Sequence, residues 1–257
     1  MIVDSRNMEF GHELFAAVPY AYYLYKNKQL TGTRSAIGTE PFYYFSPKHV
    51  INAAARHSSQ VWGSEVPNVK VKEFTGEGEW IAPPYKARYA NRRFVYDKPI
   101  LVIANKYNQE WFGPPVNYLN TETILKIIDM CKDRYEIFYN RALPVILADD
   151  QVHLDMGEHE VIRSAYPEVR FVHELPGEFN VNQLRLYANC DRFISVQGGN
   201  SILASYFGGI NLVYTVKGNE LGGGFYERLK KLSGCEVAGV RTYSNLLNMV
   251  SRLYETT

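Results

Sequence analysis

The chain has 257 residues, of which 46% are hydrophobic and 21% are charged. This composition is typical of a globular protein that is long enough for one large domain or two smaller ones. The formal net charge is only +1 and no basic stretch stands out, which argues against binding to nucleic acid.

The three cysteines, Cys131, Cys190 and Cys235, are too far apart in sequence for a disulfide framework or a zinc site. They indicate a reducing compartment, and we expect a soluble cytoplasmic protein. No window approaches about 18 uninterrupted apolar residues, so no membrane span is expected. Residues 1–30 also lack the pattern of a signal peptide.

The first part of the chain, residues 1–97, has a weak and irregular pattern. Polar and glycine-containing loops separate its apolar runs. Its Pro- and Tyr-containing stretch at 66–93 is compatible with either an acceptor platform or a lid. The expected elements are a strand at 1–3, a helix at 11–30 that Pro19 kinks or divides, a loop at 31–40, a strand at 41–47 and a short helix at 49–55.

From residue 98 the pattern becomes regular, because apolar strands alternate with helical segments. This alternation predicts an α/β fold with a doubly wound parallel sheet. We therefore expect two α/β halves, residues 1–97 and 98–257. The strands expected in the second half are 100–104, 143–148, 169–173, 192–196, 210–215 and 235–240. The helices expected there are 121–135, 158–166, 181–189, 200–207, 226–232 and 243–254.

A glycine turn follows the expected strand at 192–196. Gly198 and Gly199 are followed by Asn200 and Ser201, which are favourable residues for the start of a helix. Such a turn directs backbone N–H groups and the positive end of a helix dipole toward an anion such as phosphate. Glycine turns also occur for packing alone, but polar residues concentrate here where packing would favour small apolar ones.

Other polar loops follow strands of the same predicted sheet. Because ligands of such sheets bind outside the carboxyl ends of the strands, these loops are expected to share one rim. They suit a nucleotide or a nucleotide-sugar, and the glycine turn matches neither a P-loop nor a dinucleotide fingerprint. The rim residues are Asn105, Lys106, Tyr107, Asp149, Asp150, Glu174, Leu175, Pro176, Gln197, Gly198, Gly199, Asn200, Ser201, Lys217, Gly218, Asn219 and Glu220.

Three segments carry a family resemblance: NKYNQEW at 105–111, LYANCDRFISVQGGNSILASYFGG at 186–209 and YTVKGNEL at 214–221. Through them the chain resembles the donor-binding half of GT-B glycosyltransferases, which have two Rossmann-like domains. It looks most like small glycosyltransferases of capsule-building bacteria and of large DNA viruses of algae, including a xylosyltransferase type. The first half is shorter than typical GT-B acceptor domains, which leaves the acceptor site open.

The resemblance implies transfer of a sugar from a nucleotide-sugar to a hydroxyl of a glycan or glycoprotein. UDP-xylose is the implied donor, with GDP-fucose as the alternative, and inversion without a metal is implied. On this interpretation Gly198, Gly199, Asn200 and Ser201 hold the diphosphate, with Lys106 adding positive charge. Glu174, Leu175 and Pro176 contact the base or ribose. Asp149 and Asp150 fit a turn better than a metal site.

An inverting transfer needs a general base near the acceptor hydroxyl. His12 follows Gly11 at the start of the first expected helix and resembles the placement of the catalytic histidine in some GT-B families. Glu13, Asp4 and Glu9 are the carboxylate alternatives. His12 and Glu13 are equally compatible with a simple helix cap.

Two other classes of function are compatible with the sequence. One is a non-catalytic module that binds a nucleotide or glycan, in which the 20 tyrosines would mark an interaction surface. The other is an NAD-linked enzyme that modifies sugars, which is less favoured because residues 2–11 lack a glycine fingerprint.

Overall fold

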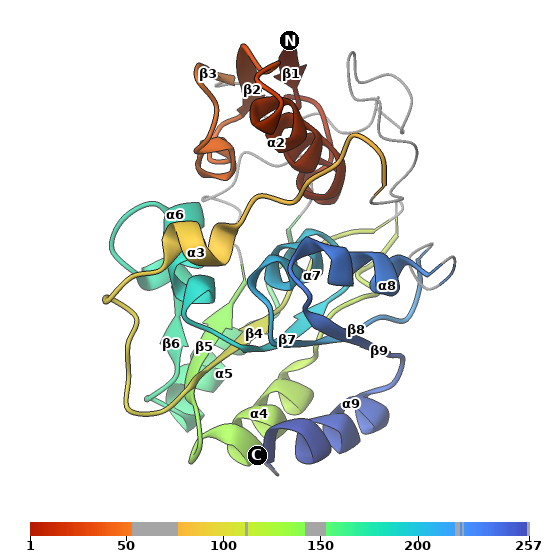
Figure 1. Cartoon of the computed structure of the whole chain (residues 1–257). Coiled ribbons are helices and arrows are strands. Elements are labelled where there is room, and N and C mark those ends of the chain that lie inside the picture. Colours follow the sequence, from red (N-terminus) through yellow and green to blue (C-terminus); the bar gives the residue numbers. More distant parts are fainter. Residues whose placement is uncertain (53–76, 111–112, 142–152, 219–221, 223, 256–257) are drawn as a thin grey trace.

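A computed structural model describes residues 1–52, 77–110, 113–141, 153–218, 222 and 224–255. Within these residues the chain forms a three-stranded sheet of order β1-β2-β3 and a six-stranded sheet of order β6-β5-β4-β7-β8-β9. The strand pairs in both sheets are parallel. Figure 1 shows the smaller sheet at the N-terminal end of the molecule and the larger sheet below it. The predicted α/β class with a parallel sheet in the second half is confirmed.

The first half contains β1 (Ile2–Asp4), β2 (Gly32–Ala36) and β3 (His49–Asn52). The expected first helix is present as α1 (Phe10–His12), a π-helical turn (Glu13–Ala17) and α2 (Val18–Lys26). Pro19 lies in the first turn of α2, where a missing backbone N–H costs little.

Three predictions in this half are wrong. The expected loop at 31–40 contains β2, and the described part of the expected helix at 49–55 is β3. The aromatic run at 41–47 forms no strand; its first residues belong to a 3₁₀ turn, Glu40–Tyr43. Phe42, Tyr43 and Phe45 are all buried there. The run is therefore aromatic because its side chains belong to the core, and it lacks the alternating pattern of a strand.

The second half follows the predicted alternation closely. The strand expected at 143–148 lies outside the described residues. A strand that the sequence did not predict, β5, is present at 136–140. The strands are β4 (Ile100–Ala104), β5 (Glu136–Asn140), β6 (Arg170–Phe171), β7 (Arg192–Val196), β8 (Ile210–Tyr214) and β9 (Glu236–Val240). The helices are α4 (Thr121–Cys131), α5 (Glu158–Ala165), α6 (Phe179–Ala188), α7 (Gly199–Ala204), α8 (Phe225–Leu229) and α9 (Tyr243–Val250).

Helices cover both faces of the larger sheet, as doubly wound folds require. One face packs against α4, α5 and α9, whose inward residues include Ile124, Ile162 and Leu246. The other face packs against α6, α7 and α8, which lie on the side of the first half in Figure 1. These three helices therefore lie between the larger sheet and the first half.

The hydrophobic core is continuous between the two halves. The cluster that contains Phe15 and Leu14 of the first half also contains Tyr206 and Phe225 of the second. The Phe15 and Phe225 rings lie 5.4 Å apart, and the buried Tyr206 hydroxyl donates to the Leu14 carbonyl at 2.6 Å. This shared core fixes how the start of the first helix meets the larger sheet.

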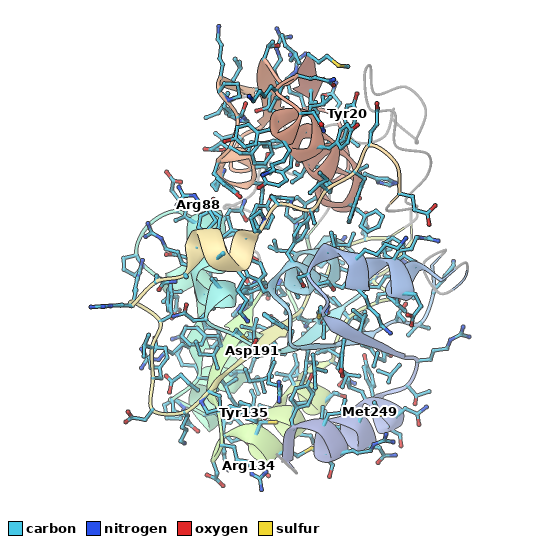
Figure 2. All side chains as sticks on the ribbon, viewed as in Figure 1. Tyr20, Arg88, Arg134, Tyr135, Asp191 and Met249 are labelled. Atoms are coloured by element: carbon cyan, nitrogen blue, oxygen red, sulfur yellow. The ribbon has the colours of Figure 1, made fainter. Side chains whose placement is uncertain are left out.

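The described segment 77–97, at the end of the predicted first half, packs against both halves. It contains α3 (Tyr85–Tyr89), which lies beside α6 in Figure 1. The Tyr85 ring lies 4.7 Å from the Tyr206 ring of the second half. Figure 2 shows Arg88 on α3, where its guanidinium lies 5.1 Å from the centre of the Tyr44 ring of the first half.

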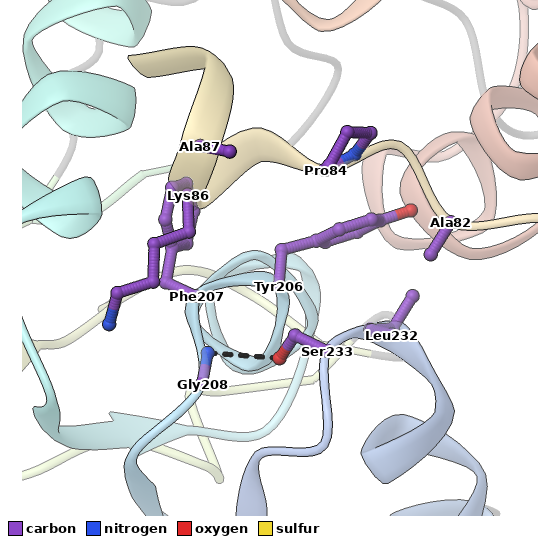
Figure 3. Close-up of a pocket in the computed structure, with 9 residues that line it drawn as sticks. All are labelled: Ala82, Pro84, Lys86, Ala87, Tyr206, Phe207, Gly208, Leu232 and Ser233. Carbon is purple, nitrogen blue, oxygen red and sulfur yellow. Dashed lines mark hydrogen bonds between the residues drawn. The ribbon is translucent and has the colours of Figure 1, made fainter. Parts of the chain in front are cut away.

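A hollow of about 340 Å³ lies between this segment and the end of α7. Figure 3 shows Pro84 and Lys86 on one side of it and Tyr206 and Ser233 on the other. Gly208, which lines it, comes just before β8, so the hollow lies at the amino end of that strand. Ligands of doubly wound sheets bind at the opposite, carboxyl edge.

Candidate functional site

The order of the strands selects one place on the rim of the larger sheet. The chain enters at β4, moves outward through β5 to β6, and then returns to β7 on the other side of β4. Ligands bind where the strand order reverses in this way, because the loops on either side diverge and leave a crevice. The loops after β4 and β7 carry Asn105, Lys106 and the glycine turn, so this part of the predicted rim lies at the switch point.

The glycine turn has the geometry that its sequence predicts. Gly198 has φ 122° and ψ −161°, a backbone conformation that side chains disfavour. A Cβ atom on Gly198 would lie 3.4 Å from Nζ of Lys106, so the ammonium group lies directly over the turn. Ser201 closes the first turn of α7, since its N–H and hydroxyl donate to the Gly198 carbonyl at 3.1 and 2.8 Å.

The start of α1 packs directly against this turn. A Cβ atom on Gly199 would lie 2.5 Å from Cδ1 of Phe10, and one on Gly11 would lie 3.1 Å from Cδ1 of Ile202. Both glycines therefore allow a close approach that a larger residue would prevent. The segment that carries His12 is thereby held beside the glycine turn of the other half.

His12 is paired with Glu9. One carboxylate oxygen of Glu9, Oε2, accepts the His12 backbone N–H at 3.0 Å and lies 3.0 Å from Nδ1 of the ring. Partial burial acts to raise the pKa of the Glu9 carboxyl, but the hydrogen bonds and charge at His12 outweigh it and leave the pKa below its usual value. Glu9 is therefore ionised at neutral pH.

The other two predicted catalytic carboxylates have protein partners. Glu13 is fully buried, and its Oε1 accepts from Ser5 Oγ at 2.7 Å and from Tyr43 OH at 3.0 Å. Asp4 forms an ion pair with Arg6 at 2.6 Å. Glu13 thus points into the first half, where it joins β1 to the 3₁₀ turn.

The loop after β4 begins with a buried residue, Asn105, and continues with the more exposed Lys106. Asn105 is fully buried, and its side chain binds the Leu119 backbone and the Tyr139 hydroxyl at 2.8 to 3.0 Å. It positions the loop. Lys106 is partly exposed and forms an ion pair with Glu110 at 3.0 Å, while the Tyr107 ring packs on Tyr118.

Asn117 joins this loop to the one after β8. Its side chain donates to Glu110 Oε2 and to the Lys217 carbonyl, both at 2.9 Å, and accepts from the backbone N–H groups of Val216 and Lys217. The predicted residues Lys106 and Lys217 are therefore brought to the same part of the rim. Sequence reasoning missed Asn117 and Glu110; the only signal was their polar character near a strand end.

Gln197 is buried, and its side-chain oxygen accepts from the Thr215 hydroxyl. Asn200 donates to the Asn105 carbonyl at 3.2 Å. These two side chains hold the turn between the neighbouring loops. Both side chains therefore have protein partners, and the backbone N–H groups remain as the groups of the turn that the sequence predicts to bind an anion.

Glu174, Leu175 and Pro176 lie farther from the turn. They follow β6, which is separated from β7 by β5 and β4. At about 4.8 Å per strand this is about 14 Å, so only an extended ligand would reach both places. Glu174 is exposed, and its hydrogen bond with Arg163 lowers the pKa of its carboxyl.

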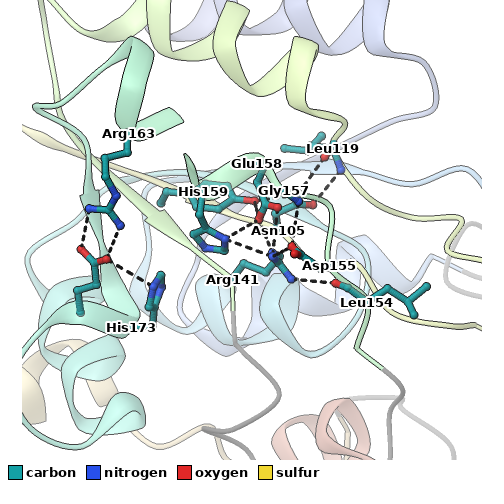
Figure 4. A network of polar contacts seen from close by, with 12 residues as sticks. Asn105, Leu119, Arg141, Leu154, Asp155, Gly157, Glu158, His159, Arg163 and His173 are labelled. Carbon is teal, nitrogen blue, oxygen red and sulfur yellow. Dashed lines mark hydrogen bonds and ion pairs between the residues drawn. The ribbon is translucent and has the colours of Figure 1, made fainter. Parts of the chain in front are cut away.

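The sequence did not predict a buried ion pair that lies between the glycine turn and residues 174–176. Arg141 follows β5 and binds both carboxylate oxygens of Glu158 at the start of α5 (Figure 4). The Tyr139 hydroxyl donates to the same carboxylate at 3.0 Å and accepts from Asn105. The network thereby connects α5 to the loop after β4.

His159 beside this network gives a testable dependence of stability on pH. Burial is the main cause that lowers its pKa from 6.5 to about 4. Between these values the unfolded chain binds more protons than the folded one, so the free energy of unfolding falls as the pH falls from 6.5 to 4. Urea unfolding of His159→Gln should show this dependence reduced by about 1 to 3 kcal/mol. Equal dependence in both proteins would contradict the assignment.

Neither a metal-binding cluster nor a membrane-spanning helix is found in the described residues. Among them, no group of three or more His, Cys, Asp or Glu side chains could hold a metal ion. Asp149, Asp150, Asn219 and Glu220 lie outside the described residues. No helix in the described parts of the chain is long and apolar enough to cross a membrane.

Comparison with known proteins identifies the fold. No protein family matches the sequence, and no curated protein matches it. Among solved structures, the chain is similar to the ADP-heptose LPS heptosyltransferase II of E. coli, with a TM-score of 0.60 at 9% identity over 98% of each chain. A glycosyl transferase family 9 protein of Veillonella parvula matches at a TM-score of 0.42 and 12% identity, over 90% of this chain and 61% of that one. The chain therefore has the GT-B-like α/β fold of the heptosyltransferase, as the sequence predicted.

Proposed function

We propose that the chain is a glycosyltransferase that moves a sugar from a nucleotide-sugar to a glycan hydroxyl. The observation that carries the proposal is the packing of α1 on the glycine turn. It puts a candidate base, His12, beside a candidate diphosphate site at the switch point of the sheet. The fold shared with a heptosyltransferase supports the same reaction class.

In this proposal the glycine turn and Lys106 bind the donor diphosphate. The first N–H groups of a helix lack intrahelical partners, and those at the start of α7 would stabilise the diphosphate. Lys106 lies over Gly198, so its ammonium group is placed to neutralise the diphosphate as it leaves. Glu110 holds that ammonium group in position until the donor arrives.

His12 acts as the general base. Its ring takes the proton of the acceptor hydroxyl while the hydroxyl oxygen forms a bond to the anomeric carbon. The bond from that carbon to the diphosphate breaks, and the nucleoside diphosphate leaves with the electron pair. Attack opposite the leaving group inverts the anomeric centre, and no metal is needed for any of these steps. The acceptor binds on the side of the first half.

The donor is proposed to be UDP-xylose or GDP-fucose, as the sequence resemblance implies. The heptosyltransferase is described as acting with ADP-heptose, which makes ADP-sugars a third candidate. Glu174, Leu175 and Pro176 would contact the base or ribose of a donor that extends along the rim.

A panel of nucleotide-sugars tests the proposal. Purified protein is incubated with UDP-xylose, GDP-fucose and an ADP-sugar, with EDTA or with Mg²⁺, and released nucleoside diphosphate is measured. Release from one donor, stimulated by a glycan acceptor and unaffected by EDTA, is the expected result. No release from any donor would contradict transferase activity, and binding without release would favour a non-catalytic module.

Removal of the Lys106 charge should weaken donor binding. Lys106→Ala is expected to raise the Kd for the preferred nucleoside diphosphate by about 10- to 100-fold, because a charge-assisted contact to phosphate is lost. Calorimetry measures the Kd. The matched control is Lys126→Ala on α4, whose lysine pairs with Glu122 on an exposed helix face. Equal Kd values for the two variants would show that Lys106 does not contribute to donor binding.

A further inference from the structure

The contact between Glu9 and His12 suggests a second residue in the catalytic unit. We propose that Glu9 positions His12 and fixes its tautomer, so that Nδ1 carries the proton and Nε2 is the atom that accepts a proton from substrate. The inference rests on the proposed function. Glu9 acts through His12 and is a positioning residue.

The tautomer follows from the chemistry of the pair. An ionised carboxylate can only accept hydrogen bonds, so a bond at 3.0 Å between Glu9 Oε2 and Nδ1 of His12 requires a proton on Nδ1. In a neutral imidazole the other nitrogen, Nε2, then carries the lone pair. The second bond, from the His12 backbone N–H to the same Oε2, fixes the carboxylate relative to the ring.

The residue between them makes this arrangement possible. A Cβ atom on Gly11 would lie 3.0 Å from Glu9 Oε2 and 3.1 Å from Cδ1 of Ile202. Glycine at position 11 therefore lets the carboxylate bend back over the helix start and lets α7 approach from the other side. Glu9, Gly11 and His12 therefore form one unit on the segment that packs against α7.

The other candidate carboxylates, Glu13 and Asp4, bind other residues of the first half. Glu13 is turned into the first half, where Ser5, Thr39 and Tyr43 donate to its Oε1. Asp4 is paired with Arg6. Of these three acidic residues, Glu9 is the one whose described contacts include the His12 ring.

The pair also stabilises the product of proton transfer. When Nε2 takes the proton of the acceptor hydroxyl, the ring becomes a cation that remains hydrogen-bonded to the Glu9 carboxylate. The Nδ1 proton stays on the ring, so Glu9 exchanges no proton and its charge is unchanged. The proton leaves Nε2 to solvent after the product departs, which restores the neutral ring.

Variants at position 9 separate positioning from helix capping. Serine is a favourable first residue for a helix, but its hydroxyl is too short to reach Nδ1 of His12. Glu9→Ser should therefore fold normally and lower kcat by about 10- to 100-fold, with the donor KM within twofold. Glu9→Gln keeps the length of the side chain without its charge, so its kcat should fall less than that of Glu9→Ser. If Glu9 only caps the helix, Glu9→Ser will keep the full kcat, which would overturn the inference.

Two further measurements make the test decisive. Glu178→Ser is the matched control, because Glu178 begins α6 without a side-chain cap bond and should tolerate serine without loss of kcat. Nitrogen NMR of the His12 ring, which needs no activity, should show a proton on Nδ1 in the wild-type protein and on Nε2 in Glu9→Ser. A wild-type ring protonated on Nε2 would refute the pairing. A wild-type protein that transfers no sugar would refute the proposed function, while the spectrum still decides the pairing.

Discussion

Replacement of His12 by alanine is expected to lower kcat for sugar transfer by about 10²- to 10⁴-fold, the usual contribution of a general base. The donor KM should change little, because the proposed donor site at Gly198 and Lys106 does not include the imidazole ring. The His12 side chain, at the end of α1, is 23% exposed, so its removal leaves no large cavity. Steady-state kinetics with the preferred donor measures both constants.

A second histidine of the first half provides the control for this variant. His49 binds Thr33 at 2.7 Å and Ser35 at 3.1 Å across the small sheet. His49→Asn is expected to keep kcat within about twofold, apart from any loss of stability. Full activity in His12→Ala would instead assign the proton transfer to another group, with Asp4 and Glu13 as the first candidates to replace in turn.

The largest effect on stability is expected for the buried ion pair of the second half. Arg141 is 3% exposed and Glu158 is fully buried, and together they connect β5 to α5. Arg141→Met should lower the free energy of unfolding by about 3 to 5 kcal/mol, because the Glu158 carboxylate is left buried without its partner. Urea unfolding followed by circular dichroism measures the change.

The exposed pair of Arg163 and Glu174 is the matched comparison. Arg163→Ala should leave the free energy of unfolding almost unchanged, because water readily replaces an exposed partner. Adding Glu158→Leu to Arg141→Met should recover part of the lost stability, since no charge then remains buried. A cost for Arg141→Met no larger than that of Arg163→Ala would show that the buried pair contributes little.

The second half of the fold was predictable because its strands are buried on both faces. Ile100–Ala104 and Arg192–Val196 are apolar-rich runs with polar loops at their ends, a pattern typical of parallel sheets. The first half lacked this signal. The strand Gly32–Ala36 consists of small and polar residues, and its burial comes from neighbours that no local pattern identifies.

The geometry of the candidate site was predictable only where it depends on local sequence. The turn at Gly198 could be found because glycine beside helix-starting residues has a conformational meaning. Glu9 and His12 were both candidates, but their contact depends on Gly11, whose role appears only when α7 is placed against α1. Arg141 and Glu158 lie 17 residues apart and meet through the fold, so no spacing rule could pair them.

Calorimetric titration of the wild-type protein with UDP, GDP, ADP, CDP and NAD, all in the presence of EDTA, tests whether the protein binds the nucleotide part of a nucleotide-sugar. The account predicts saturable binding of one nucleoside diphosphate without metal, weakened in Lys106→Ala and retained in His12→Ala. Binding of NAD alone, or of none of the five ligands, would contradict it.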